Sequence, residues 1–439
     1  MERADRFGIR GQTLAFRADP FEVAPDAAMS FESDGIVVVH GGCIEYVGPA
    51  AAALVRYPGL RIESYPGDLI MAGFVDTHVH YPQTGIIASY GAQLIDWLNR
   101  YTFPAELAFA DARLARTRAD FFLDECLRNG VTTASVYCTV HPQSVDAFFE
   151  AADARGFRMA AGKVLMDRNA PAGLTETAER GYDETKDLIA RWHGKGRLTY
   201  AITPRFAPTS SPEQLAAAGA LWRMHPDCLM QTHLSESPAE IAWVRSLFPE
   251  APDYLGVYER HGLVGPGANF GHAIHLGEPE IARLFESGSG VSHCPTSNLF
   301  IGSGLFDMAR MTDRARAIPV GLASDVGGGS SFSMFATMRA AYEIAQLRGV
   351  SLHPARAYYL ATLGGAKVLR LDDRIGNLAP GYEADIVIID LKSRPLLADR
   401  VERAGDLSEV LFAEMILADD RAIRAVFVGG RRAYVRDDA

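Results

Sequence analysis

Short apolar runs alternate with amphipathic segments through the central part of the chain. Each of these runs has the length of a buried strand, and a helical pattern follows most of them. The runs are Phe74–Val79, Val131–Tyr137, Ala160–Met166, Leu198–Phe206, Leu229–Glu236, Asn269–His275, Gly290–Pro295 and Val320–Asp325. Strands that alternate with helices in this way predict an α/β fold, a (β/α)8 TIM-like barrel, with the reacting groups at the C-terminal ends of the strands.

The helical segments carry start and stop signals. "SPEQLAAAGALWRMH" and "SPAEIAWVRSLF" begin with Ser-Pro and an acidic residue, and "EPEIARLFESG" stops at a glycine. "SFSMFATMRAAYEIAQLRG" is a long amphipathic stretch. A doubly wound sheet is the alternative, but the chain has neither the G-x-G-x-x-G turn nor the P-loop lysine motif typical of such sheets.

Both ends of the chain have a different pattern. "GIVVVHGGCIEYVGP" predicts a hairpin that turns at Gly41-Gly42, and "EADIVIIDL" and "IRAVFVGGRRAYVR" near the other end are also rich in β-branched residues. We therefore expect one small β domain built from residues 1–70 and 369–439, around a barrel of residues 71–368.

Composition narrows the class of protein. The chain has 439 residues, 48% of them hydrophobic, and a formal net charge of -11, which argues against a nucleic-acid binder. The 5 cysteines are scattered, as is typical of reduced thiols in a cytosolic protein. The sequence predicts a cytoplasmic protein, because it shows neither a signal peptide nor an apolar stretch long enough to span a membrane.

The candidate chemistry begins at the first barrel strand, where "GFVDTHVHYPQ" places two histidines two positions apart. In a strand, residues i and i+2 point to the same face and are about 6.6 Å apart along the strand. The imidazoles of His78 and His80 can therefore coordinate one metal ion. The alternative interpretation is that His78 and His80 are two ordinary polar residues at the end of a strand. The residues at the ends of the other strands distinguish the two interpretations.

Those strands deliver more polar side chains at the same end: His233, Glu236, His272 and Asp325. A single histidine at a strand end is more often an ordinary polar residue than a metal ligand. The prediction of a metal site therefore rests on several such residues occurring together at corresponding strand ends. Imidazoles together with a carboxylate suit Zn²⁺ or Fe²⁺.

The segments "DTHVH", "THLSE", "GH" and "ASD", in that order, resemble the amidohydrolase superfamily of metal-dependent barrel hydrolases. The closing "IGNLAPGYEADIVIIDL" resembles its C-terminal β segment, so the resemblance covers nearly the whole chain. Longer segments resemble guanine deaminases in particular: "LIDWLNRYTFPAE", "GKVLMDRNAP", "TPRFAPT", "HCPTSNLFIGSG" and "SDVGGGSSFSM".

The resemblance implies one divalent metal ion, zinc in preference to iron. Two-metal members carry a bridging lysine at the end of strand four, whereas this chain has Thr203, Pro204, Arg205 and Phe206 there. Lys163 lies on strand three and is expected to be structural. The implied metal ligands are His78, His80, His233 and Asp325.

The resemblance also implies a reaction, the hydrolytic deamination of guanine to xanthine and ammonia. A metal-bound hydroxide attacks C2 of guanine, and Asp325 accepts the proton of the bound water. Glu236 protonates a ring nitrogen and later the leaving amine. His272 polarises or positions the water, a role as fifth ligand being the weaker alternative.

The implied substrate-binding residues are Gln83, Arg205, Phe206 and Trp97, with a loop over residues 81–104 as a cover. Arg205 in a plain salt bridge and Trp97 in plain packing are the alternatives, and His275, His293 and Cys294 are expected to be structural. The implied assembly is a homodimer that takes guanine and water and binds neither nucleic acid nor membrane.

Two other functions compete with this one. A related one-metal aminohydrolase could act on another ring, such as 8-oxoguanine, a triazine or an adenosine derivative. A metal-free, non-catalytic barrel is the second, although such a descendant would typically have lost a ligand or the glutamate. The zinc deaminases of the cytidine type need a Cys-x-x-Cys pair, which this sequence lacks.

Overall fold

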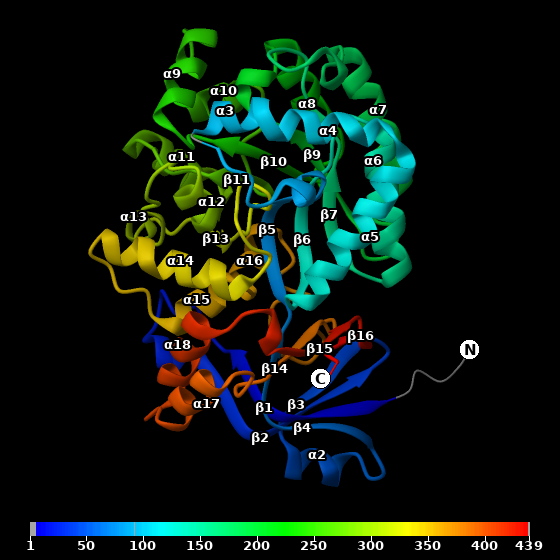
Figure 1. Cartoon of the computed structure of the whole chain (residues 1–439), viewed down its shortest axis with the longest axis vertical. Helices are drawn as coiled ribbons and strands as arrows, with labels where there is room; N and C mark the ends of the chain where they lie inside the picture. The colour runs from blue at the N-terminus through cyan, green and yellow to red at the C-terminus, as the bar shows by residue number, and fades with distance from the viewer. Residues whose placement is uncertain (1–5, 92, 438–439) are drawn as a thin grey trace.

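A parallel β-barrel occupies the centre of the computed structural model, which describes residues 6–91 and 93–437 (Figure 1). Its strands follow one another in chain order around the barrel, and each pairs in parallel with its neighbour. They are β5 (Phe74–His80), β6 (Val131–Tyr137), β7 (Arg158–Gly162), β9 (Thr199–Pro204), β10 (Leu229–Leu234), β11 (Ala268–His272), β12 (Gly290–His293) and β13 (Val320–Leu322). The expected barrel is confirmed, and each strand overlaps one of the runs that the sequence predicts.

Hydrogen bonds between the first and last strands bring the barrel close to full closure. The Thr77 hydroxyl donates to the carbonyl of Leu322 at 3.1 Å, and the amide of Asp325 donates to the carbonyl of His78 at 3.0 Å. These contacts bring the end of β13 beside the histidines of β5. The third expected run is interrupted at Lys163, after which the short β8 (Val164–Leu165) pairs with β9.

Helices surround the barrel strands. Those expected from their start signals form, with boundaries close to the expected ones. The outer helices are α5 (Ala112–Arg128), α6 (Pro142–Arg155), α7 (Ala178–Trp192), α8 (Pro212–Met224), α9 (Pro238–Leu247), α10 (Tyr254–Arg260), α11 (Glu278–Ser287), α12 (Pro295–Phe300), α13 (Met308–Met311), α14 (Met334–Leu347) and α15 (Pro354–Leu360). The short α16 (Leu363–Val368) joins an apolar cluster with Val75, Ala160, Ala201 and Leu229, and this cluster closes the base of the barrel.

A second sheet lies beside the barrel and is built from both ends of the chain, as the blue and orange-red strands of Figure 1 show. Its strands, in sheet order, are β16 (Arg431–Val435), β15 (Ile423–Val428), β14 (Ile386–Ile389), β4 (Arg61–Ala72), β1 (Phe7–Phe16), β2 (Met29–His40) and β3 (Cys43–Pro49). The two ends meet where β4 pairs antiparallel with β14, Ala72 opposite Ile386. The expected β domain from both chain ends is confirmed as a sheet.

Glycine pairs make the turns of this sheet. Gly41 and Gly42 have φ of 63° and 83°, a left-handed conformation that favours glycine, and they close the expected hairpin between β2 and β3. The short helices α1 (Pro25–Ala28) and α2 (Ala50–Arg56) lie between the N-terminal strands. Two further helices, α17 (Pro395–Glu402) and α18 (Leu407–Leu417), separate β14 from β15, and α18 packs against α14 and α15.

The segment after β5, expected as a covering loop, is largely helical. It runs through η1 (Tyr81–Ile86), α3 (Leu94–Trp97), η2 (Leu98–Thr102) and α4 (Phe103–Leu107). Leu98 and Phe103 bury their side chains in an apolar cluster with Phe206, so packing rather than turn residues fixes this segment over the barrel mouth. Within the described ranges, no helix combines the length and the apolar character needed to cross a bilayer.

Candidate active site

A pocket opens at the carboxyl ends of the barrel strands. Its walls are largely apolar with a few polar side chains, as is usual for small-molecule sites. Every predicted site residue except His78 lines it. His78 is fully buried directly beneath, with its Nε2 atom 3.3 Å from Nε2 of His80. The structure therefore brings together the whole set of residues that the sequence predicts.

Three imidazoles at the base of the cavity aim one nitrogen each at a common point. Nε2 of His80 lies 3.3 Å from Nε2 of His78 and 3.2 Å from Nε2 of His233. Ligand nitrogens bound tetrahedrally at about 2.0–2.1 Å from one ion are about 3.3 Å apart. Gly271 leaves room for this packing, because a Cβ there would lie 2.5 Å from Cε1 of His78. The spacing fits a single metal ion.

The protonation of these imidazoles also fits a metal site. Nδ1 of His233 donates to the carbonyl of Arg205 at 2.7 Å, which leaves Nε2 without a hydrogen. Nδ1 of His78 and of His80 is buried without a hydrogen-bond partner in the described chain. Burial lowers the pKa of His78, and burial and the neighbouring imidazoles lower those of His80 and His233 much further. Neutral imidazoles are the form that binds metal.

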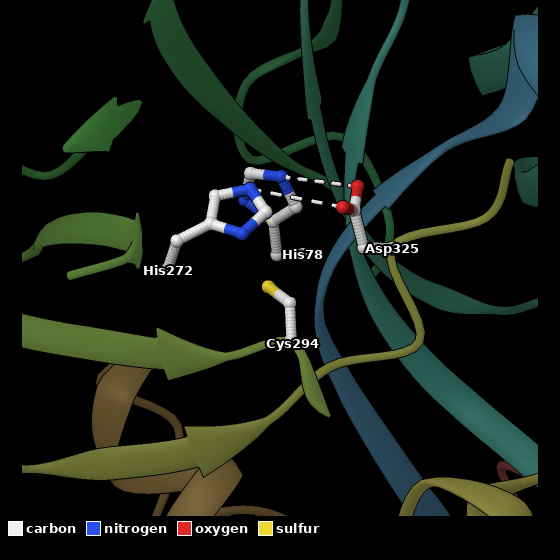
Figure 2. A group of neighbouring side chains, drawn as sticks. All are labelled: His78, His272, Cys294 and Asp325. Atoms are coloured by element: carbon white, nitrogen blue, oxygen red, sulfur yellow. Dashed lines mark ion pairs between the residues drawn. The ribbon is translucent and has the colours of Figure 1, made fainter. Parts of the chain in front are cut away.

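Asp325 completes this group from the end of β13. Its Oδ1 lies 3.5 Å from Nε2 of both His78 and His80, and its Oδ2 lies 3.7 Å from Nε2 of His272 (Figure 2). Burial alone would raise the pKa of this carboxyl, but the surrounding imidazoles of His78, His272 and His233 together outweigh burial and lower the pKa to about 2. Asp325 is thus an anion that adds an oxygen ligand to the three nitrogens.

Cys294 lies beside His78, His272 and Asp325 in Figure 2, close enough to be considered as a ligand. Its Sγ donates to the carbonyl of Ser292 at 3.5 Å, and burial raises the pKa of the thiol to about 11. Metals bind the thiolate rather than the thiol, so the protonated Cys294 is a poor ligand.

Glu236 and His272 form a second pair on the cavity wall. Oε2 of Glu236 lies 3.6 Å from Nε2 of His272, and the hydroxyl of Ser303 donates to Oε1 of Glu236 at 2.8 Å. Burial raises the pKa of Glu236, whereas the charge of Glu236 raises the pKa of His272 well above its usual value against the effect of burial. Asn298 accepts from Nδ1 of His272 at 2.9 Å and fixes its ring. The pair can hold and pass a proton.

The cavity wall also carries Gln83 and Arg205, which a buried glutamate connects. Nη1 of Arg205 donates to both carboxylate oxygens of Glu106, at 2.9 and 2.7 Å, and Nε2 of Gln83 donates to the same carboxylate at 3.1 Å. Arg205 therefore makes the salt bridge that the alternative interpretation expects and still lines the cavity. Phe206 and Trp97 add aromatic surface to this wall.

The residues expected to be structural lie outside the cavity lining. Lys163 is buried and pairs with Glu176, and Nε2 of His275 faces the carbonyl of Ser303 at 2.8 Å. His293 stacks on a phenylalanine, with ring centroids 4.3 Å apart.

Sequence reasoning assigned no role to Glu106, Asn298 or Ser303, although each lies in a segment quoted for the resemblance. Only their place in those segments could have pointed to them, because a lone Glu, Asn or Ser carries no chemical signal of its own.

A second group of potential ligands lies at the opposite end of the barrel strands. It consists of His193, Asp227 and Cys228, in the segments that precede β9 and β10. The amide of Tyr200 donates to Nδ1 of His193 at 3.1 Å, so the neutral ring carries its hydrogen on Nε2, which faces Asp227 at 3.0 Å. That nitrogen cannot bind a metal while it donates to the carboxylate. His193 and Asp227 therefore form a hydrogen-bonded pair rather than a metal site.

Comparison with known proteins agrees with the site. Residues 69–433 match the amidohydrolase family. A guanine deaminase from Escherichia coli is 48% identical over 95% of this chain and 95% of its own length. A solved structure of E. coli guanine deaminase has a TM-score of 0.95 at 47% identity, covering 98% of this chain and all of the other.

A third comparison concerns a solved guanine deaminase from C. acetobutylicum that has guanine bound in its active site. Its TM-score is 0.89 at 27% identity, and the match covers 98% of this chain and 100% of that one. The fold, the cluster at the barrel mouth and these full-length matches agree. The chain belongs to the amidohydrolase family and, within it, to the guanine deaminases.

Proposed function

We propose that this protein deaminates guanine by hydrolysis, giving xanthine and ammonia. The observation that carries the proposal is one cavity whose walls hold an imidazole–carboxylate cluster, a proton-carrying pair and a set of donors for a purine edge. The relatives that match over nearly the full length are named guanine deaminases, which supports the same reaction.

We assign the metal position to His78, His80, His233 and Asp325, with zinc as the ion. Nitrogen donors with one carboxylate and tetrahedral spacing favour Zn²⁺, although the same donors also bind Fe²⁺. When bound, the ion supplies Lewis-acid activation of water. The chain's own contribution is to keep the three imidazoles neutral and Asp325 ionised, so that the ligands are ready in the form that binds.

Proton transfer is assigned to Glu236. Its carboxyl is buried with a raised pKa, so it can arrive protonated and donate to a ring nitrogen of the substrate. It then takes a proton from the attacking water and delivers it to the amine at C2, which leaves as ammonia. Asp325 accepts the first proton of the water and passes it to Glu236 once ammonia has left, which restores both carboxyls. His272 positions the water through its contact with Asp325.

Substrate selection is assigned to the part of the cavity wall that carries Gln83 and Arg205. Arg205 donates to the carbonyl O6 of guanine, Gln83 reads the neighbouring N1 position, and Phe206 with Trp97 provides faces for the ring. Adenine has an amine in place of O6 and no amine at C2, where the reaction takes place. Sites that hydrogen-bond a substrate group reject analogues without it by about 10⁴–10⁵-fold.

A substrate panel tests the proposal. Ammonia release is measured for guanine, 8-oxoguanine, adenine, cytosine and a triazine, with the metal content determined by elemental analysis on the same sample. We expect efficient turnover of guanine only, with a single zinc ion per chain. A preference for 8-oxoguanine or a triazine would support the related aminohydrolase instead, and no turnover with no metal would support the non-catalytic barrel.

Two further parts of the proposal concern the protein in the cell. The homodimer rests on the resemblance to the family and on the frequency of twofold assemblies among soluble enzymes. The cytoplasmic location rests on the scattered cysteines, which are typical of a reducing compartment. Sedimentation of the purified protein and fractionation of cells test these two predictions.

A further inference from the structure

Glu106 lies behind the cavity wall and contacts two of the residues assigned to substrate binding. Its side chain is fully buried in α4, and it is absent from the residues that line the cavity. One carboxylate receives both bonds from Nη1 of Arg205 and one from Nε2 of Gln83. A buried carboxylate that contacts both residues can orient both.

The orientation follows from the chemistry of the carboxylate. An ionised carboxylate only accepts hydrogen bonds, so the amide of Gln83 must turn its nitrogen toward Glu106. Oε1 of Gln83 then faces the amide of Gly327 at 3.4 Å, a weak contact that leaves acceptor capacity for a ligand.

The same carboxylate determines how Arg205 faces the cavity. Both bonds to Glu106 leave from Nη1, so Nε and Nη2 stay available as donors. The guanidinium lies over the ring of Phe103, 5.8 Å from its centroid, which restricts its plane. The wall therefore presents an acceptor at Gln83 beside a donor at Arg205.

We propose that Glu106 is a specificity-determining positioning residue that holds Gln83 as an acceptor and Arg205 as a donor, matching the N1–H and carbonyl O6 of guanine. The inference rests on the proposed function and extends it to a residue that does not touch the substrate. An acceptor beside a donor complements a lactam edge, in which a ring N–H is adjacent to a carbonyl. It mismatches an edge with a bare ring nitrogen beside an amine.

Two substrates isolate this edge. Guanine and 2,6-diaminopurine both carry the amine at C2 that is to be released. They differ at the edge read by the wall: guanine has N1–H and O6, whereas 2,6-diaminopurine has a bare N1 and an amine at C6. The ratio of their kcat/KM values therefore measures the orientation of Gln83 and Arg205, largely independently of the chemistry at C2.

Glu106→Gln changes the orientation with little change in shape. The new amide can donate to Oε1 of Gln83, which allows Gln83 to turn over and present its nitrogen to the cavity, and the charge opposite Arg205 is lost. We expect the ratio of kcat/KM for guanine to kcat/KM for 2,6-diaminopurine to fall by about 10- to 100-fold, because the KM for guanine rises. This is the size of effect expected for the loss of a charge-assisted hydrogen bond. The metal content should not change.

Glu414→Gln is the matched control. Glu414 is also fully buried but lies on α18, away from the cavity lining, so the same replacement of a buried glutamate by glutamine there should leave the ratio of kcat/KM values unaltered. In a Gln83→Ala background, Glu106→Gln should lower the ratio less than in the unaltered chain, because part of its effect passes through Gln83.

The outcomes are separable from those of the proposed function. Ammonia release from guanine by the unaltered chain decides the proposed function alone. Suppose that the unaltered enzyme is active, and that the Glu106→Gln variant has the same metal content, KM for guanine and ratio of kcat/KM values as the unaltered enzyme. Glu106 is then merely structural and the inference is wrong. If Glu106→Gln does not fold, Glu106→Asp decides: the shorter carboxylate should lower the ratio if the inference holds, and an unchanged ratio overturns it.

Discussion

Two groups of histidine and acidic side chains lie at opposite ends of the barrel, one at its mouth and one before β9 and β10. Each holds at least three potential metal-ligand atoms within 4.8 Å of one another. At the mouth, Nδ1 of His233 donates to a carbonyl and leaves Nε2 free, whereas at the base Nδ1 of His193 accepts from an amide and puts the hydrogen on Nε2. The ligand atoms are equally close together in both groups, but the position of one hydrogen separates a metal site from a hydrogen-bonded pair.

The largest expected effect follows from removing a ligand at the mouth. Asp325→Asn replaces the anion with a neutral amide among the imidazoles, so the ion should be lost. Because the ion supplies several kcal/mol of catalysis, guanine turnover should fall by about 10⁴-fold or more. Elemental analysis and ammonia release on the same sample check both effects. A variant that keeps its ion and its turnover would show that Asp325 is not a ligand.

Glu236→Gln should separate metal binding from proton transfer. The amide keeps the shape of the side chain but cannot carry a proton, so turnover should fall by about 10²–10⁴-fold while the ion and guanine binding remain. Stopped-time ammonia assays with elemental analysis measure the two effects. Activity within a few-fold of the unaltered chain would assign the shuttle to another group, with His272 the nearest candidate.

Arg205→Ala should weaken guanine binding without releasing the ion, because His233 bonds to the backbone carbonyl of residue 205 and not to its side chain. The change leaves the buried carboxylate of Glu106 without its cation, which should cost about 3–5 kcal/mol of stability. Thermal melting records that loss, and steady-state kinetics should show a higher KM with a lower kcat/KM. Pairing the variant with Glu106→Gln should recover part of the stability; no recovery would contradict the role given to this pair.

The smallest effects are expected at the base of the barrel. Cys228→Ser should leave metal content and guanine turnover unchanged, since the buried thiol, whose pKa burial raises to about 12, is not a ligand. His193→Ala should cost only about 1 kcal/mol, for the lost bond from the amide of Tyr200. Titration with zinc, followed by elemental analysis after dialysis, checks the absence of a second ion. A second tightly held ion that disappears in either variant would remove the distinction between the two groups.

The sequence predicted the barrel and the residues of its mouth because both follow local rules. Apolar runs mark the buried strands, and the carboxyl ends of parallel strands must meet at one face, so His78 and His272 were expected together before their contacts were known. The resemblance to known motifs added roles for Gln83 and Arg205. These roles stay predictions until they are measured.

Other features depend on tertiary contacts that no local pattern contains. The segment after β5 has the composition of a loop, yet burial of Leu98 and Phe103 makes it helical. Glu106 acquires its partners only because α4 folds back over the end of β9, about 100 residues further along the chain. The hydrogen bond that sets the tautomer of His193 comes from the backbone amide of Tyr200, and no local sequence pattern predicts that contact.

The pairing of β4 with β14 has a consequence for how the chain is made. These strands are about 300 residues apart, and ribosomes add about 5–20 residues per second, so β4 must wait roughly 15–60 s for its partner. During that interval the apolar stretch from Leu69 to Ala72 is an open edge, which is a site of misassembly with other nascent chains. Translation speed and chaperone supply, rather than the stability of the finished enzyme, are therefore expected to limit the yield of active protein.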